Sequence, residues 1–137
     1  MKIGIIGSMQ FSDKMIEAAD ELRKLGHEPV LSLFIQSFIG QNPDEQERIK
    51  LEQKNNEDAM RRDVEHLEEV DAILVFNIEK HGLTGYIGGN TFLEIGMMHL
   101  KRKPIYLLNP IPDIPYYQTE IEAMKPVVIN GHLEKIK

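Results

Sequence analysis

The sequence contains no cysteine, and this absence excludes disulfide bonds, thiol catalysis and metal sites built from cysteine. Long apolar runs are also missing, since none approaches the roughly 20 residues that a membrane-spanning helix needs. Residues 2–7 already form an apolar strand pattern without a basic segment or cleavage site before them, so we expect no signal peptide. Together these absences favour a cytoplasmic protein that does not contact a membrane.

The sequence has fewer basic than acidic residues: 16 Lys and Arg and 22 Asp and Glu residues give a net charge of -6. This balance argues against a nucleic-acid duplex or an anionic membrane as the main partner. A small anionic ligand stays compatible, because backbone N–H groups can bind it locally. The five histidines show no spacing typical of a metal site, so we expect no structural metal.

The remaining composition, 42% hydrophobic and 28% charged over 137 residues, is typical of one folded domain. Apolar runs with strand character alternate along the chain with segments of helical period. The predicted strands are 2–7, 29–34, 71–77, 104–109 and 126–130, and the predicted helices are 12–26, 44–69, 91–103 and 118–124.

Such alternation favours parallel strands with helices on both faces. We therefore predict a single domain over 1–137, an α/β fold with a three-layer, doubly wound, five-stranded parallel sheet of flavodoxin-like (Rossmann-like) order. Ligands of such sheets bind outside the carboxyl ends of the strands, near the switch point of the strand order. This rule selects the segments 7–12, 77–91 and 109–117 as candidate sites.

The long predicted helix at 44–69 changes character along its length. Asn42 and Pro43 suit its start, as a capping residue and a first-turn proline. Its first half is polar, and we expect that half to project from the core as a lid or a partner surface. Its second half carries apolar residues at helical spacing and should pack on the sheet.

The segment "GSMQFS" follows the first strand and precedes a helix. Glycine allows close approach of a ligand to the backbone, and the helix start offers N–H groups to an anion. The segment matches neither G-x-G-x-x-G nor the Walker A pattern. Two interpretations stay open: contact with a ligand, or a turn closed by Ser8 and a helix capped by Ser12.

Glu94 interrupts an otherwise apolar helix, and two roles fit it. Thr91 and Glu94 have the spacing of a capping box, in which the two side chains satisfy each other's backbone donors. A carboxylate in the first turn of a helix, at the carboxyl edge of a sheet, is also placed to act as a nucleophile. Carboxylates form covalent intermediates at anomeric carbons. The two roles do not exclude each other.

Asp63 lies in the second half of the long predicted helix, beside Arg61 and Arg62. It is either a solvated helix residue or, where the helix end approaches the pocket, a second carboxylate that holds or protonates a leaving base. The sequence alone favours the first interpretation.

Three segments together resemble the nucleoside 2-deoxyribosyltransferase superfamily: "IIGSM", "RRDVEHLEEVDAILVFN" and "GGNTFLEIGMMHLKRKPIYLL". The superfamily includes the deoxyribosyltransferases and the 2'-deoxynucleoside 5'-monophosphate N-glycosidases. The resemblance implies that Glu94, in the E-I-G motif, is the nucleophile at C1' of the sugar and that Asp63 lies near the base. In the branch that cleaves monophosphates it implies that Gly7, Ser8 and Met9 bind the 5'-phosphate.

The loop before the glutamate would contact the 5' end of the sugar through Gly88, Gly89, Asn90 and Thr91. This chain also departs from the family. A strand-one tyrosine that orients the nucleophile is replaced by Gly4 or a neighbouring isoleucine. The aspartate that binds the sugar 5'-hydroxyl is replaced by Gly88, which argues against a free-nucleoside transferase. A longer loop brings Lys80, His81 and Tyr86 as possible replacements.

The resemblance implies an enzyme that cleaves or transfers the N-glycosidic bond of a nucleotide or nucleoside, most simply a 5'-monophosphate, without a cofactor. The alternative is a non-catalytic nucleotide-binding or sensing module of the same fold, since "GGNTFLE" is also similar to the loop of lonely-guy-type phosphoribohydrolases. The resemblance further implies a homodimer or higher homo-oligomer, with 109–120 as the segment that completes a neighbouring site. Within it, Tyr116 or Tyr117 would stack on a base or pack at the interface. The identity of the base, ribose or deoxyribose, and hydrolysis or transfer stay open.

Overall fold

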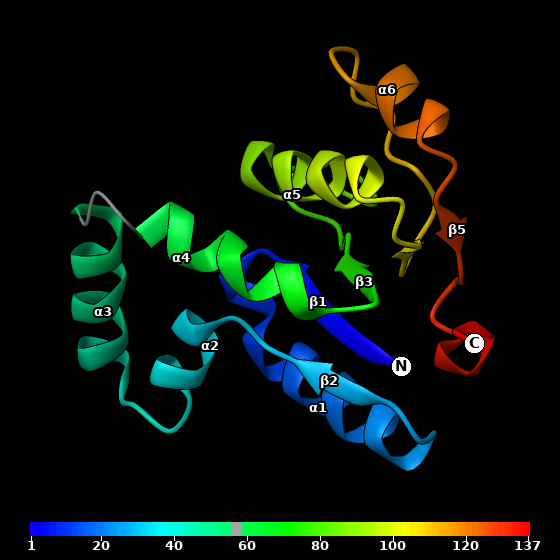
Figure 1. The fold of residues 1–137 in the computed structure, drawn as a ribbon. Helices are drawn as coiled ribbons and strands as arrows, with labels where there is room; N and C mark the ends of the chain where they lie inside the picture. The colour runs from blue at the N-terminus through cyan, green and yellow to red at the C-terminus, as the bar shows by residue number, and fades with distance from the viewer. Residues whose placement is uncertain (56–58) are drawn as a thin grey trace.

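The computed structural model describes residues 1–55 and 59–137, and these form a five-stranded parallel sheet with helices on both faces (Figure 1). The strands are β1 (Lys2–Gly7), β2 (Glu28–Val30), β3 (Ala72–Phe76), β4 (Ile105–Leu107) and β5 (Val127–Val128). Their order in the sheet is β2-β1-β3-β4-β5, and every neighbouring pair is parallel. The predicted fold class and flavodoxin-like strand order are confirmed.

The helices of the described chain connect these strands as crossovers. They are α1 (Ser12–Lys24), α2 (Leu33–Phe38), α3 (Pro43–Asn55), α4 (Ala59–Glu65), α5 (Gly89–Leu100) and α6 (Gln118–Ala123), with 3-10 turns η1 (Met9–Phe11), η2 (His66–Glu69) and η3 (Leu133–Lys135). Among the described residues, no helix combines the length and the apolar character that crossing a membrane requires.

Two separate cores follow from the pleat of the strands, because successive side chains point to opposite faces of a sheet. Ile5 of β1 packs with Met15 and Leu22 of α1 on one face. Its neighbour Ile6 packs with Ile95 of α5 on the other face. Burial on both faces explains why the strands are continuous apolar runs, and it gives the predicted three layers.

The parallel register brings the ends of the central strands to one edge. Gly7 of β1 lies opposite Phe76 of β3, and Val75 of β3 lies opposite Leu107 of β4. The loops that leave these strands therefore start side by side, as the topology rule predicted.

The second predicted strand was too long. β2 ends at Val30, and Leu33 begins the short helix α2. The reason is Ser32, whose Oγ accepts a hydrogen bond of 3.1 Å from the Ile35 backbone N–H and so caps α2. Ser12 is not a helix cap as predicted, because it is the first residue of α1 and its hydroxyl donates to the Met9 carbonyl.

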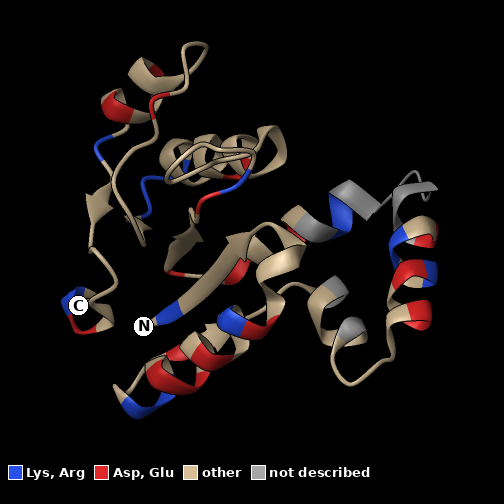
Figure 2. Cartoon of the chain, turned by 180° about the vertical axis from the view of Figure 1, so that it is seen from behind, with Lys and Arg blue, Asp and Glu red and all other residues tan. Residues whose placement is uncertain are grey.

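The prediction of a single helix over 44–69 was also wrong. The structure has α3 and α4, whose axes run in different directions, and residues 56–58 of the predicted helix lie outside the described chain (Figure 1). Asn42 does cap α3, since its Oδ1 accepts a hydrogen bond of 2.8 Å from the Glu45 backbone. α3 stands away from the sheet and carries interleaved acidic and basic residues (Figure 2). Its use as a lid or partner surface stays a prediction.

Gly7 ends β1 in a conformation that only glycine adopts easily. Its φ is +151°, and a Cβ built there would lie 2.8 Å from Met15 Cε and 3.0 Å from the Phe76 carbonyl oxygen. The oxygen belongs to the neighbouring strand and cannot move without disturbing the sheet.

We expect Gly7→Ala to lower the free energy of unfolding by about 2 kcal/mol or more, through backbone strain and overlap with β3. Gly96→Ala is the matched control, since a Cβ placed at this position inside α5 meets no atom within 4 Å apart from the backbone of its own helix and its chain neighbours. It should raise the free energy of unfolding by up to about 1 kcal/mol. Urea titration of both variants measures the difference, and an unchanged Gly7→Ala midpoint would contradict the interpretation.

Candidate active site at the carboxyl edge of the sheet

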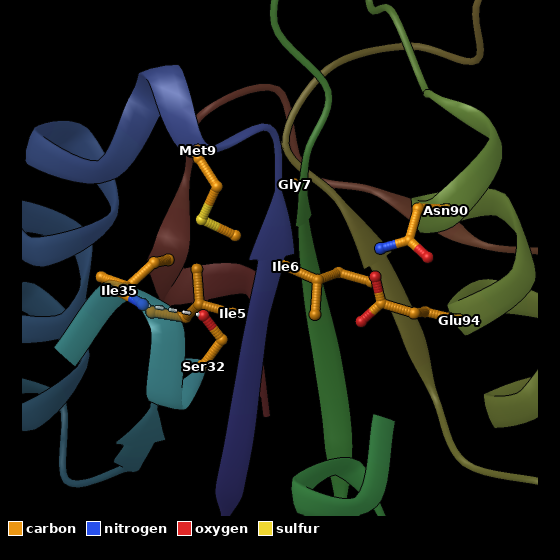
Figure 3. A pocket seen from close by; sticks show the side chains of 8 residues that line it. All are labelled: Ile5, Ile6, Gly7, Met9, Ser32, Ile35, Asn90 and Glu94. Carbon is orange, nitrogen blue, oxygen red and sulfur yellow. Dashed lines mark hydrogen bonds between the residues drawn. The ribbon is translucent and has the colours of Figure 1, made fainter. Parts of the chain in front are cut away.

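A pocket lies over the carboxyl end of β1, next to the switch point between β1 and β3. Its space measures about 310 Å³ when the open mouth is included. It is lined by Ile5, Ile6, Gly7, Met9, Ser32, Ile35, Asn90 and Glu94 (Figure 3). Isoleucines and a methionine form its walls, and three polar side chains face in. This mixture of apolar walls and a few polar groups is typical of small-molecule sites.

Glu94 is the charged group of this pocket and is only 8% exposed. Figure 3 shows its carboxylate extending from α5 toward Ile6 of β1. It is also the single Asp, Glu, Lys or Arg residue of α5, which is otherwise apolar or neutral. Burying a carboxylate is costly, so its position beside a pocket suggests a chemical use.

The predicted capping box is wrong. α5 begins at Gly89 with Gly88 as its N-cap, so Thr91 is already inside the helix. A capping box needs its Thr at the N-cap and its Glu at the third helical residue, and here these positions are Gly88 and Thr91. For the same reason Glu94 is the sixth residue of α5 and lies in the second turn rather than the predicted first turn. Glu94 is therefore not at the position from which a capping box acts.

Strand one leaves no room for a tyrosine at Gly4. A Cβ at Gly4 would lie 2.9 Å from Leu67 Cδ2 and would also touch Val70. The next residue on the same face, Ile6, lines the pocket together with Glu94. An isoleucine thus stands beside the carboxylate from the strand in which the resembling family has a tyrosine.

The structure brings the predicted phosphate loop to the pocket. Gly7 and Met9 line it, and Ser8 lies between them. Ser8 precedes η1, but its side chain does not cap that turn. Instead Ser8 Oγ accepts a hydrogen bond of 3.0 Å from Lys80 Nζ, which comes from the loop after β3. Two of the three segments selected by the topology rule are therefore in contact.

The predicted sugar-contacting residues divide into two groups. Asn90 lines the pocket one helical turn before Glu94. Gly88, Gly89 and Thr91 are not among the lining residues, and Thr91 is buried inside α5. Asp63 belongs to α4, and its side chain lies outside the described part of the structure. Its place near the base stays a prediction.

Ser32 is a pocket residue that sequence reasoning missed. It is 6% exposed and lines the pocket from the start of α2, opposite α5 (Figure 3). Its Oγ accepts from the Ile35 backbone, so its own proton can be donated to a second group. It lay within the run that the sequence favoured as strand, and this concealed it.

Asn77 and Asn109 hold the edge of the sheet together, and neither was singled out from the sequence. Asn77 is fully buried. Its Oδ1 accepts a hydrogen bond of 2.9 Å from the Asn109 backbone, and its Nδ2 donates to the carbonyls of Asn109 (2.7 Å) and Pro110 (3.1 Å). Asn109 Nδ2 donates in return to the Asn77 carbonyl at 3.0 Å. We call this pair the asparagine clamp. A signal was present, since each asparagine directly follows a predicted apolar strand core.

Tyr117 fastens the loop after β4 to the start of α5 within the same chain. Its hydroxyl donates to the Ile87 carbonyl, and its ring stacks on Phe92 with centroids 4.5 Å apart. Burial, followed by the charge of Tyr86, raises the pKa of the Tyr117 phenol. Tyr116, by contrast, is 89% exposed. Tyr117 thus packs inside its own chain, and contact of the 109–120 segment with a neighbouring subunit stays a prediction.

In the described residues, no three His, Asp or Glu side chains gather in an arrangement that could hold a metal ion. The fold and the edge pocket define a flavodoxin-like α/β protein whose site lies at the switch point of its sheet.

Comparison with known proteins places this fold among solved structures. No protein-family model matches the sequence, and no curated protein matches it either. The chain is similar in structure to a 2-deoxyribosyltransferase from Bacillus psychrosaccharolyticus, with a TM-score of 0.51 and 17% identity over 78% of this chain and 71% of that chain. It is also similar to the CMP N-glycosidase BcmB of Clostridium botulinum, with a TM-score of 0.47 and 18% identity over 93% and 84% of the two chains. The fold that the motif resemblance implied is thus confirmed, since this chain shares it with a 2-deoxyribosyltransferase.

Asn77→Asp should lower the free energy of unfolding by about 2 kcal/mol at pH 7, because the new carboxylate would face the two carbonyls that Nδ2 now binds. Burial should raise its folded-state pKa above the unfolded value of about 3.9. A raised folded pKa means stability that is present below that value and lost as the pH rises. The deficit should therefore shrink near pH 4. Asn42→Asp, at an exposed cap, is the control, and equal urea midpoints for both variants would contradict the clamp.

Tyr117→Phe should cost about 1 kcal/mol of unfolding free energy through loss of the bond to Ile87, whereas Tyr116→Phe should be neutral within about 0.5 kcal/mol. The raised pKa of Tyr117 stabilises the wild type below pH about 10, and this contribution disappears as the pH rises further. Thermal unfolding between pH 8 and pH 11 tests both points. A Tyr116→Phe effect as large as that of Tyr117→Phe would overturn this assignment.

Proposed function

We propose that the chain cleaves or transfers the N-glycosidic bond of a nucleotide or nucleoside, with Glu94 as the nucleophile. The observation that carries the proposal is the position of Glu94, a buried carboxylate in the pocket that does not serve as a helix cap. The fold supports it, because a 2-deoxyribosyltransferase is built on the same sheet. The motif resemblance assigns the same residue independently.

The chemistry follows from a carboxylate at an anomeric carbon. A Glu94 oxygen donates an electron pair to C1' while the C1'–N bond breaks and its electrons leave with the base. A glycosyl ester on Glu94 results. Asp63, or a water that it holds, supplies the proton to the departing base. In hydrolysis, water attacks C1', the C1'–O bond to Glu94 breaks and restores the carboxylate, and Asp63 takes the proton of the water. In transfer, a nitrogen of a second base attacks C1' in place of water.

The apolar walls of the pocket suit the site to this reaction. The buried side chains of Ile5, Ile6 and Ile35 line the pocket and keep the surroundings of Glu94 weakly polar. In such surroundings an electrostatic interaction between the carboxylate and a developing positive charge at C1' is stronger than in water. Asn90 and Ser32 are placed to hydrogen-bond sugar hydroxyls from opposite walls.

The substrate that we favour is a 5'-monophosphate. The Gly7–Met9 loop contributes to the pocket, and the position at which a transferase would carry an aspartate for a free 5'-hydroxyl is Gly88. A second candidate function, a nucleotide-binding module without catalysis, is favoured by one observation. Strand one presents isoleucine rather than tyrosine beside Glu94.

Glu94→Gln should lower base release by at least about 10³-fold, since the amide keeps the shape of the side chain but is not a nucleophile. The assay incubates the full chain with ribo- and deoxyribonucleosides and their 5'-monophosphates and measures free base by chromatography. Glu17→Gln, on the exposed face of α1, is the matched control and should leave base release unchanged.

Undiminished base release by Glu94→Gln would refute the role of Glu94 as the nucleophile. Absence of release by the wild type, together with a higher melting temperature in the presence of a monophosphate, would favour the binding module instead. If the wild type neither releases base nor is stabilised by a monophosphate, both proposed functions are rejected.

A further inference from the structure

Lys80 connects the loop after β3 to the Gly7–Met9 wall of the pocket. Its Nζ donates a hydrogen bond of 3.0 Å to Ser8 Oγ, across 72 positions of sequence. Ser8 stands between two residues that line the pocket. The contact thus places a positive charge beside the loop where the strand order switches.

The backbone around Lys80 holds this side chain in place. Lys80 and Leu83 exchange backbone hydrogen bonds of 3.2 and 3.0 Å. The two residues between them, His81 and Gly82, have φ values of 53° and 74°. Positive φ at both central positions is the geometry of a type I′ turn, which is a tight and well-defined connection. The Lys80 side chain is therefore attached to a backbone of fixed conformation.

An aromatic ring flanks the same cation. Lys80 Nζ lies 5.9 Å from the centroid of the Tyr86 ring, within the range of cation–π attraction. The His81 ring packs edge-on against Tyr86 with centroids 5.4 Å apart. Tyr86 is thereby held between its neighbours, and the position of the charge is further restricted.

The charge of Lys80 has no acidic counterpart in the described structure. Lys80 is half-buried, and no Asp or Glu of the described residues forms an ion pair with it, although the chain carries a net charge of -6. Ser8 takes one of the three ammonium N–H donors, and the Ser8 hydroxyl keeps its own proton for another acceptor. Lys80 and Ser8 together therefore offer charge and hydrogen-bond donors that suit an anion.

We propose that Lys80, together with Ser8, binds the phosphate monoester of the substrate and that Lys80 determines the preference for a phosphorylated sugar. This inference rests on the proposed function for the identity of the substrate, but it concerns a residue outside the lining of the Glu94 pocket. Lysine acts as a point charge toward phosphate, and a hydrogen bond to a charged group is stronger than a neutral one.

The test compares Lys80→Met with the wild type on a deoxynucleoside 5'-monophosphate and on the matching deoxynucleoside. Loss of one charged hydrogen bond should raise KM for the monophosphate by about tenfold to about a hundredfold and leave KM for the nucleoside within about twofold. Lys80→Arg should retain most of the preference, because it keeps the charge. Lys24→Met removes the same charge at the exposed end of α1 and should change neither KM.

A binding experiment separates this inference from the glycosidase proposal. Ribose 5-phosphate should raise the melting temperature of the wild type and of Lys24→Met, ribose should not, and Lys80→Met should lose the effect. That result without any base release would retain the anion site and reject the glycosidase. Two results would overturn the role of Lys80: base release by Lys80→Met with equal changes of KM for both substrates, or a rise of its melting temperature with ribose 5-phosphate equal to that of the wild type. Lys80 would then only connect two loops.

Discussion

The pocket of this protein depends on the asparagine clamp, the hydrogen bonds exchanged by Asn77 and Asn109 just beyond β3 and β4. The strands themselves are short, and β4 has only three residues. Beyond their ends the buried backbone groups would have no ladder partner, which is costly. An asparagine side chain carries a donor and an acceptor like a peptide group, so the clamp continues the pairing of the sheet by one step.

The asparagine clamp affects the loops along the whole carboxyl edge of the sheet. Gly85 passes so close to the Pro110 carbonyl that a Cβ would lie 2.6 Å from it, so the loop after β3 packs directly on the loop after β4. From this base the loop sends Lys80 to Ser8, and it delivers the Ile87 carbonyl to Tyr117. The start of α5 follows at once, and with it the direction in which Glu94 enters the pocket. A chain of close contacts thus leads from the two asparagines of the clamp to the candidate nucleophile.

The sequence around Glu94 does not distinguish a helix-capping residue from a catalytic one. Its spacing from Thr91 satisfies the capping pattern, yet α5 begins two residues before Thr91. Gly88 takes the cap position, and no side chain is needed there because glycine is tolerated at this site. The helix is otherwise apolar or neutral and packs on the sheet, and its one carboxylate could have been exposed or have faced a pocket. The structure shows the second.

The order of strands and helices followed from the sequence alone, because strands buried on both faces must be apolar throughout and the intervening helices must carry apolar stripes. The same patterning placed the candidate site at one edge, and the motifs indicated the fold that a solved transferase shares. Local pattern failed where an apolar run continued past a capping residue, as at Ser32, and where one helical period covered two helices, as at 44–69. Only the tertiary structure decided which distant residues bond to each other: Lys80 with Ser8, Asn77 with Asn109, and Tyr117 with Ile87. These contacts join residues that are about 30 to 70 positions apart, and their partners are chosen by the register of the sheet and the course of its loops, which no short stretch of sequence encodes.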